Sequence, residues 1–80
     1  MEYITKEFLD RKWSQTKDSE CQHVFEKNER EFAITSTHDK VLVSTPLNNS
    51  RFNYEASFIK PTDFNEIHEF IVNKLNYLEN

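Results

Sequence analysis

The chain has 80 residues with no glycine and a single cysteine, and its 14 acidic and 10 basic residues give a formal net charge of −4. Phosphate-binding loops of the P-loop, Rossmann and kinase types are excluded in their usual form, because they need glycine for close approach to a phosphate or for φ > 0. The lone cysteine excludes an intramolecular disulfide and favours a reducing, cytoplasmic location.

The length predicts one small domain spanning residues 1–80. Seven Phe, three Tyr and one Trp supply an aromatic core, since each such ring buries about 150–250 Å². Charged residues interrupt every apolar run near the beginning of the sequence, so neither a signal peptide nor a transmembrane helix is expected. The composition is that of a globular protein.

The first expected element is a short helix over Lys6–Ser14. Thr5 is placed to cap it, and Ile4 and Leu9 have the spacing of a hydrophobic staple. One broad face of this helix would hold Phe8, Leu9 and Trp13. The polar residues 14–20 offer nothing to pack and predict a loop.

From residue 21 to residue 60 the apolar residues alternate with a period of two, which predicts β-strands. Four strands are expected, at Cys21–Glu26, Arg30–Thr37, Lys40–Thr45 and Arg51–Lys60. The connections are short enough for hairpins, so the economical topology is an antiparallel meander. Because glycine is absent, the residues expected to adopt φ > 0 in the turns are Asn28, His38 with Asp39, and Asn48 or Asn49.

The alternation also sorts the two faces of the expected sheet. The core face would hold Phe32, Ile34, Val41, Val43, Phe52, Tyr54, Ala56 and Phe58. The opposite face is mostly small and polar, which suits either a solvated surface or a shallow contact surface: Ala33, Thr35, Leu42, Ser44, Glu55, Ser57 and Ile59.

A second helix begins after Pro61, where Asp63 and Glu66 have the spacing of a capping box. Its apolar stripe consists of Phe64, Ile67, Ile71, Leu75 and Leu78, and its outward face of Asn65, Glu66, Glu69, Asn73 and Asn76. The predicted fold class is α+β, in the order α-β-β-β-β-α. The second helix packs across one face of a four-stranded sheet, and the short first helix packs beside it or at the sheet edge.

Three side chains are candidates for a catalytic or metal-binding role. Cys21 and His23 would share one face of a strand, as a nucleophile or half of a metal site, and His68 could join them if the second helix covers that strand. A second cysteine or a His-x-x-x-His partner is missing, so a structural thiol and a packed helix-edge histidine are the favoured interpretations. His38 is most simply a turn residue. No catalytic, cofactor-binding or metal-binding residue is predicted.

The sequence contains two candidate binding surfaces of opposite charge, one acidic and one basic. Residues 61–80 carry four acidic side chains against Lys74 alone, which argues against direct nucleic-acid binding there. The outward Glu66 and Glu69 could imitate a phosphate backbone, or could simply be a solvated helix face. A cationic patch that includes Trp13 could bind single-stranded nucleic acid, although Glu7 and Asp10 interrupt its basic residues: Lys6, Arg11, Lys12 and Lys17. The favoured interpretation of Trp13 is that it anchors the short helix on the sheet or on a partner.

Exposed aromatic residues often anchor protein interfaces, although a small domain can also use all its rings as core. The residues predicted to bind a partner are Trp13, Glu66, Glu69, Phe70, Asn73 and Tyr77. The leading functional prediction is a cytoplasmic, non-enzymatic module that binds another protein as an inhibitor, regulator or adaptor. A phage-type antagonist of a host nucleic-acid enzyme or defence complex is one specific version.

Two alternatives belong to other functional classes. One is an assembly subunit, such as a homodimer, that self-associates through a sheet edge or through Phe70 and Tyr77. The other is a small enzyme or metal protein that uses Cys21, His23 and His68.

Overall fold

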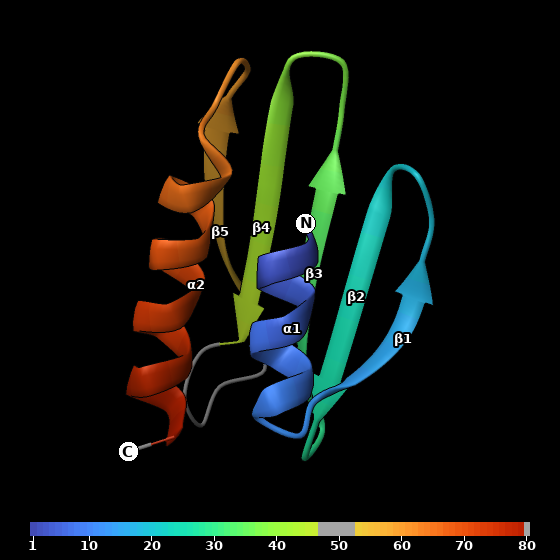
Figure 1. Ribbon diagram of the computed structural model, residues 1–80, viewed down its shortest axis with the longest axis vertical. Coiled ribbons are helices and arrows are strands. Elements are labelled where there is room, and N and C mark those ends of the chain that lie inside the picture. Colours follow the sequence, from blue (N-terminus) through green and yellow to red (C-terminus); the bar gives the residue numbers. More distant parts are fainter. Residues whose placement is uncertain (47–52, 80) are drawn as a thin grey trace.

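Seven elements follow one another along the chain in the computed structural model, which describes residues 1–46 and 53–79 (Figure 1). They are α1 (Glu2–Asp10), β1 (Ser14–Asp18), β2 (Gln22–Lys27), β3 (Arg30–Ser36), β4 (Lys40–Pro46), β5 (Asn53–Ile59) and α2 (Phe64–Glu79). The strands form one antiparallel sheet in the order β1-β2-β3-β4-β5, with both helices on the same face (Figure 1). The predicted α+β meander is confirmed, but the sheet has five strands instead of four.

The additional strand is β1, which lies where a loop was expected. It pairs with β2 from Ser14 opposite Glu26 to Asp18 opposite His23, and its register shifts between Gln15 and Lys17. Because it is an edge strand with mostly exposed side chains, it needs no apolar alternation. Backbone pairing therefore forms this strand without leaving a pattern in the sequence.

The other strands follow the predicted ones with shifts of one or two residues at their ends. Phe32, Ile34, Val41 and Val43 are buried on the core face as predicted, and the partly buried Phe58 packs against the same cluster. Within residues 1–46 and 53–79, the opposite face of the sheet carries no helix (Figure 1). The expected turn at residues 46–50 and the expected inward side chain of Phe52 involve residues outside the described part of the chain, and the side chain of Tyr54 is not described either.

The first helix begins and ends four residues earlier than predicted. Thr5 lies within the helix and Leu9 is 48% exposed, so the predicted cap and hydrophobic staple are both wrong. Ile4 and Phe8 form the buried stripe instead, one turn apart. Thr5 resembles a cap in the sequence, but the N-cap position is Met1, which makes no side-chain capping bond.

A Schellman motif ends this helix without glycine. The N–H of Lys12 donates to Leu9 O at 3.0 Å, and the N–H of Trp13 donates to Phe8 O at 3.0 Å. Lys12 takes the left-handed position with φ 69°, which glycine usually occupies. The turn places Trp13 edge-on against Phe8, with ring centroids 5.6 Å apart, so it also builds the aromatic core.

The turn between β2 and β3 supplies the other positive φ values among the described residues. Asn28 has φ 53°, as predicted, and Glu29 has φ 66°, which was not expected. Since Lys27 pairs with Arg30, these two residues form a two-residue hairpin loop with the φ values of a type I′ turn. The prediction of φ > 0 at His38 and Asp39 is wrong, because Thr37 Oγ1 closes that turn by accepting the N–H of Lys40 at 3.1 Å.

Replacing Glu29 with glycine is expected to stabilise the protein. The left-handed conformation costs a residue with a Cβ about 1 kcal/mol or more, and glycine removes part of that cost. Glu29→Gly should raise the free energy of unfolding by about 0.5–1 kcal/mol in urea titrations followed by Trp13 fluorescence. His38→Gly is the control and should give no gain, whereas an unchanged or lower stability of Glu29→Gly would contradict the strain at Glu29.

The second helix begins and packs largely as predicted. The Asp63 carboxylate accepts the N–H of Asn65 at 2.9 Å, which confirms its capping role. Within the described residues, the Glu66 carboxylate makes no reciprocal bond, so the capping box is half formed. Ile67, Ile71, Leu75 and Leu78 are buried, whereas Phe64 is 48% exposed at the first position of the helix and does not belong to the stripe.

Four aromatic rings form the centre of the core. Phe8 stacks on Phe25 with ring centroids 4.2 Å apart and planes 6° from parallel. Phe32 meets Phe8 edge-on at 5.1 Å and Trp13 at 5.2 Å. Trp13 is only 4% exposed, so α1 and its C-terminal turn are held against β2 and β3 by aromatic contacts.

Candidate functional site

The outward face of α2 is acidic and exposed, as predicted. Glu66, Glu69 and Asn73 are exposed, as are Asn65 and Asn76. The buried stripe holds the opposite side of the helix on the sheet. The carboxylates of Glu66 and Glu69 therefore face solvent and not another part of the fold.

Phe70 and Tyr77 lie on the flank of α2, next to this acidic face. Tyr77 is 64% exposed, and the half-buried Phe70 meets Phe58 of β5 edge-on at 5.8 Å. The Lys74 ammonium lies 5.9 Å from the centroid of the Phe70 ring. A shallow groove of about 270 Å³ is lined by Phe70, Asn73, Lys74 and Tyr77. The residue that sequence reasoning missed is Lys74, which the four-residue spacing from Phe70 would have revealed.

Trp13, the sixth predicted partner-binding residue, lies in the core and not on this surface. Its Nε1 donates to Glu79 Oε1 at 3.3 Å, a contact with the end of α2. This burial also removes the aromatic part of the cationic patch. Of the basic residues in that patch, Lys6 pairs with Asp10 at 2.7 Å and Arg11 pairs with Glu7 at 2.8 Å. The described contacts therefore do not assemble a cationic and aromatic surface.

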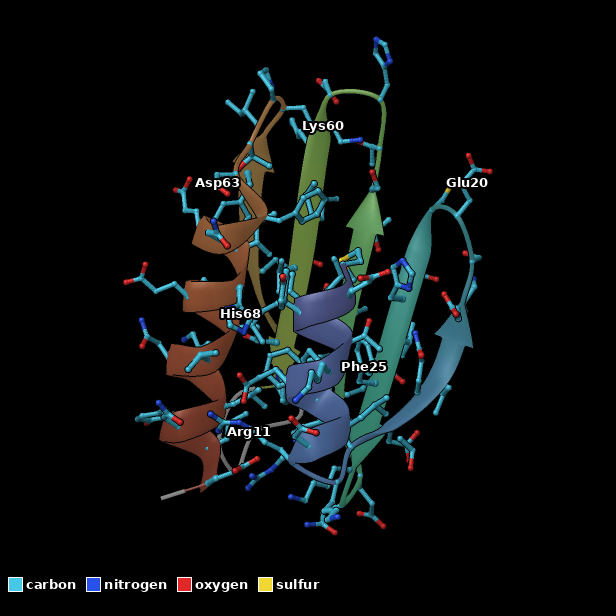
Figure 2. All side chains as sticks on the ribbon, viewed as in Figure 1. Arg11, Glu20, Phe25, Lys60, Asp63 and His68 are labelled. Atoms are coloured by element: carbon cyan, nitrogen blue, oxygen red, sulfur yellow. The ribbon has the colours of Figure 1, made fainter. Side chains whose placement is uncertain are left out.

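A polar network joins the two helices along their facing sides. Arg11 bonds Glu7 through Nε at 2.8 Å and reaches Glu79 through Nη1 at 3.5 Å. His68 Nε2 lies 3.3 Å from Glu7 Oε1, and Lys27 Nζ donates to Arg11 O at 2.7 Å. In Figure 2, the labelled His68 and Arg11 both lie between α1 and α2. His68 thus faces Glu7, and no described contact joins it to His23.

The hydrogen bond from Arg11 holds the pKa of Glu7 below its usual range, with further contributions from the Arg11 charge and from His68, while burial opposes them. Because the folded pKa is below the unfolded value, the ionised Glu7 stabilises the fold above about pH 4.3. That contribution is lost as the pH falls through the folded pKa.

Glu7→Gln should therefore cost about 1 kcal/mol of unfolding free energy at neutral pH, a value reduced by the partial exposure of the pair. The difference from the unsubstituted protein should shrink towards zero in acid, where Glu7 itself becomes protonated. Urea titrations of both proteins across the acid range test this expectation. A difference that stays constant with pH would rule out the ionised Glu7 as its source.

Cys21 is exposed and lies just before β2, so the prediction of a buried structural thiol is wrong. His23 Nδ1 lies 3.0 Å from Asp18 Oδ1 and 3.5 Å from Gln15 Nε2. His38 is exposed in the turn between β3 and β4. Across residues 1–46 and 53–79, no group of three or more His, Cys, Asp or Glu side chains is arranged to hold a metal ion.

A wider hollow of about 520 Å³ lies between the β3–β4 turn and the start of α2. Its lining includes Val41, Pro61 and Phe64, and Figure 2 shows the labelled Lys60 at this end of the molecule. The Lys60 ammonium already donates to Ser36 Oγ at 2.6 Å and to Thr37 O at 2.7 Å. The Lys60 side chain therefore links the end of β5 to the β3–β4 turn by hydrogen bonds.

The chain matches no family model, no curated protein and no solved structure. Among the described residues, no helix has the length and apolar character needed to cross a membrane. Functional proposals therefore depend on the surfaces described above.

Proposed function

We propose that this protein is a cytoplasmic, non-enzymatic module that binds another protein through the outward face and flank of α2, acting as an inhibitor, regulator or adaptor. The observation that carries the proposal is the groove beside Phe70 and Tyr77, which borders the exposed carboxylates of Glu66 and Glu69. Partly exposed aromatic side chains with charged neighbours are typical of the centre and rim of protein interfaces.

The electrostatics of α2 favour a partner with a basic surface. Glu66 and Glu69 lie one turn apart on the outward face, and Asp63 precedes them at the N-cap. A basic surface that normally binds nucleic acid would be attracted to these carboxylates, because complementary charge steers association. An antagonist of a nucleic-acid enzyme or defence complex, of the phage type, is the specific version that this charge supports.

The test is crosslinking capture of partners from the native cell or its host, using the protein and two matched variants. Tyr77→Ala should lower the recovery of a specific partner by roughly ten-fold, the effect of losing about 1.4 kcal/mol at an interface. Tyr3→Ala removes a ring of α1 that is 78% exposed, more than Tyr77, and should leave recovery unchanged. Equal recovery by both variants would count against the α2 surface.

Self-association is the second candidate, and the exposed edge of β5 favours it. Sedimentation across a range of protein concentrations separates the two candidates. A monomer at every concentration supports binding to a different protein, whereas a stable symmetric dimer supports assembly.

A further inference from the structure

The groove on α2 has the shape of a site for a side chain from another helix. Its described lining comes from this one helix, at positions i, i+3, i+4 and i+7: Phe70, Asn73, Lys74 and Tyr77. Residues three and four apart are neighbours on a helix surface, so these four residues form the corners of a diamond. When two helices pack, a side chain of one inserts into a hole between four residues of the other. The groove is such a hole, and we call it the aromatic diamond.

A second diamond lies one turn earlier on the same flank. It is formed by the residues four positions before those of the aromatic diamond: Glu66, Glu69, Phe70 and Asn73. We call it the acidic diamond, and it shares Phe70 and Asn73 with the aromatic one. The two diamonds are about 6 Å apart along the helix axis, since each residue rises about 1.5 Å. Two side chains that lie four residues apart on a partner helix have the same separation.

The two diamonds favour different side chains. The aromatic diamond is lined by the rings of Phe70 and Tyr77, and the Lys74 ammonium lies 5.9 Å from the Phe70 ring centroid. Because a cation is already present there, an apolar side chain is favoured over a basic one. The acidic diamond presents the exposed Glu66 and Glu69, so it favours Lys or Arg, whose apolar stem packs on Phe70 while its charge meets the carboxylates.

The position of α2 leaves this flank accessible. On one side of α2, His68 lies 3.3 Å from Glu7 of α1, and Figure 1 shows α1 on that side only. On the other side, α2 lies at the border of the sheet above β5, where Phe70 meets Phe58. Among residues 1–46 and 53–79, no helix lies against the flank with the two diamonds. An added helix would therefore extend the helical layer beyond α2.

The backbone of α2 distinguishes a helical partner from an extended one. The N–H and C=O groups in the middle of α2 bond to each other within the helix, so its flank offers none to a partner. An extended segment on this flank would bury its own backbone groups without hydrogen bonds, which is costly. A helical segment satisfies those groups internally and presents only side chains.

We infer that the segment of the partner that binds α2 is an amphipathic α-helix with a basic and an apolar residue four positions apart. The basic side chain enters the acidic diamond between Glu66 and Glu69, and the apolar side chain enters the aromatic diamond between Phe70 and Tyr77. This inference rests on the proposed protein-binding function and specifies the structure and chemistry of the segment that is bound.

The probe is an acetylated and amidated helical peptide of roughly 20 residues, rich in Ala and Gln, with one Arg and one Leu four positions apart. Titrated into the full chain, it should shift the amide resonances of Phe70, Asn73 and Tyr77 and leave those of α1 unchanged. A peptide with the same composition but with Arg and Leu two positions apart, on different faces, should bind at least roughly five-fold more weakly. Circular dichroism checks that the two peptides are equally helical.

Two changes in the protein test the two diamonds separately. Tyr77→Ala should weaken binding of the Arg and Leu peptide by roughly ten-fold, whereas Tyr3→Ala should leave it unchanged. Glu66→Lys combined with Glu69→Lys should reverse the charge preference, so that a peptide with Glu in place of Arg binds more tightly than the original. Because Glu66, Glu69 and Tyr77 are exposed, all these variants should fold.

A photoreactive side chain introduced at Asn73, which belongs to both diamonds, identifies the segment of a captured partner that lies against α2. Its crosslinks should map to a helix with a basic and an apolar residue four positions apart. Crosslinks to an extended segment would overturn the inference, as would equal binding of the two Arg and Leu peptides. A dimer of this chain that dissociates with Tyr77→Ala would identify a second copy as the occupant and would also overturn it.

The outcomes separate the inference from the proposal on which it rests. If Tyr77→Ala loses the captured partner but the crosslinked segment is not helical, protein binding through α2 stands and the inference fails. If the Arg and Leu peptide binds as expected but Tyr77→Ala leaves partner recovery unchanged, the proposed function of the α2 surface fails instead.

Discussion

Phe8→Ala should destabilise the protein by about 3–5 kcal/mol. Phe8 is fully buried, stacks on Phe25 and meets both Trp13 and Phe32 edge-on. Truncation removes the contacts of α1 with Trp13, β2 and β3 at once and leaves a cavity that the surrounding rings cannot fill without leaving their rotamers. A domain of this size has a total stability of about 5–15 kcal/mol or less, so much of it would be lost.

Thermal unfolding followed by circular dichroism measures the effect, since each kcal/mol shifts the Tm of a small domain by about 4–8 °C. The Tm should fall by about 12 °C or more. Tyr3→Ala, on the exposed side of the same helix, should change it by little. Phe8→Leu retains part of the buried volume and should give an intermediate Tm if the alanine variant fails to fold. A Tm of Phe8→Ala close to that of Tyr3→Ala would contradict the central role of this ring.

Ile71→Ala should destabilise the protein by about 2–5 kcal/mol. Ile71 is fully buried in the middle of the apolar stripe that holds α2 on the sheet, between Ile67 and Leu75. The variant tests whether the helix carrying the proposed binding surface folds together with the sheet or detaches from it.

Asn76→Ala is the control because Asn76 is exposed on the same helix and its removal leaves the stripe intact. Urea unfolding should show a lower midpoint for Ile71→Ala with a single transition by fluorescence and by circular dichroism. Two separate transitions would show that α2 unfolds independently, and coincident curves for the two variants would contradict the packing.

The elements that the sequence predicted well are those in which burial and local chemistry agree. Asp63 caps α2 and the stripe from Ile67 to Leu78 follows the helical period, so both the start and the buried face were predictable. The inner strands β3 and β4 bury alternate residues on one side, which leaves a period of two. The prediction of exposed Glu66, Glu69 and Asn73 follows from the same periodicity and is confirmed.

The elements that were missed depend on backbone hydrogen bonding that leaves no apolar pattern in the sequence. The edge strand β1 is held by pairing with β2 and has no apolar pattern. Lys12 and Glu29 adopt φ > 0 although neither residue type favours it, because the Schellman motif and the tight hairpin require it. Trp13 is buried because that Schellman turn places its ring against Phe8, which agrees with the expectation that it anchors the short helix on the sheet.

The proposed surface on α2 has a clear physical requirement, namely that its carboxylates and aromatic flank are available to a partner while the helix stays folded. Ile71 and its neighbours fix the helix on the sheet, and the exposed side carries Glu66, Glu69 and Tyr77. Substitutions on that side should therefore change binding without changing stability.

Partner capture with Glu66→Lys combined with Glu69→Lys tests this claim most directly. The matched control is Glu26→Lys combined with Glu31→Lys, which changes the net charge equally at a cross-strand pair of exposed residues on the sheet. The proposal predicts that the α2 variant loses the partner while the control retains it, with equal urea midpoints for the two proteins. Capture that survives the α2 reversal as well as it survives the control would contradict binding through the acidic face of α2.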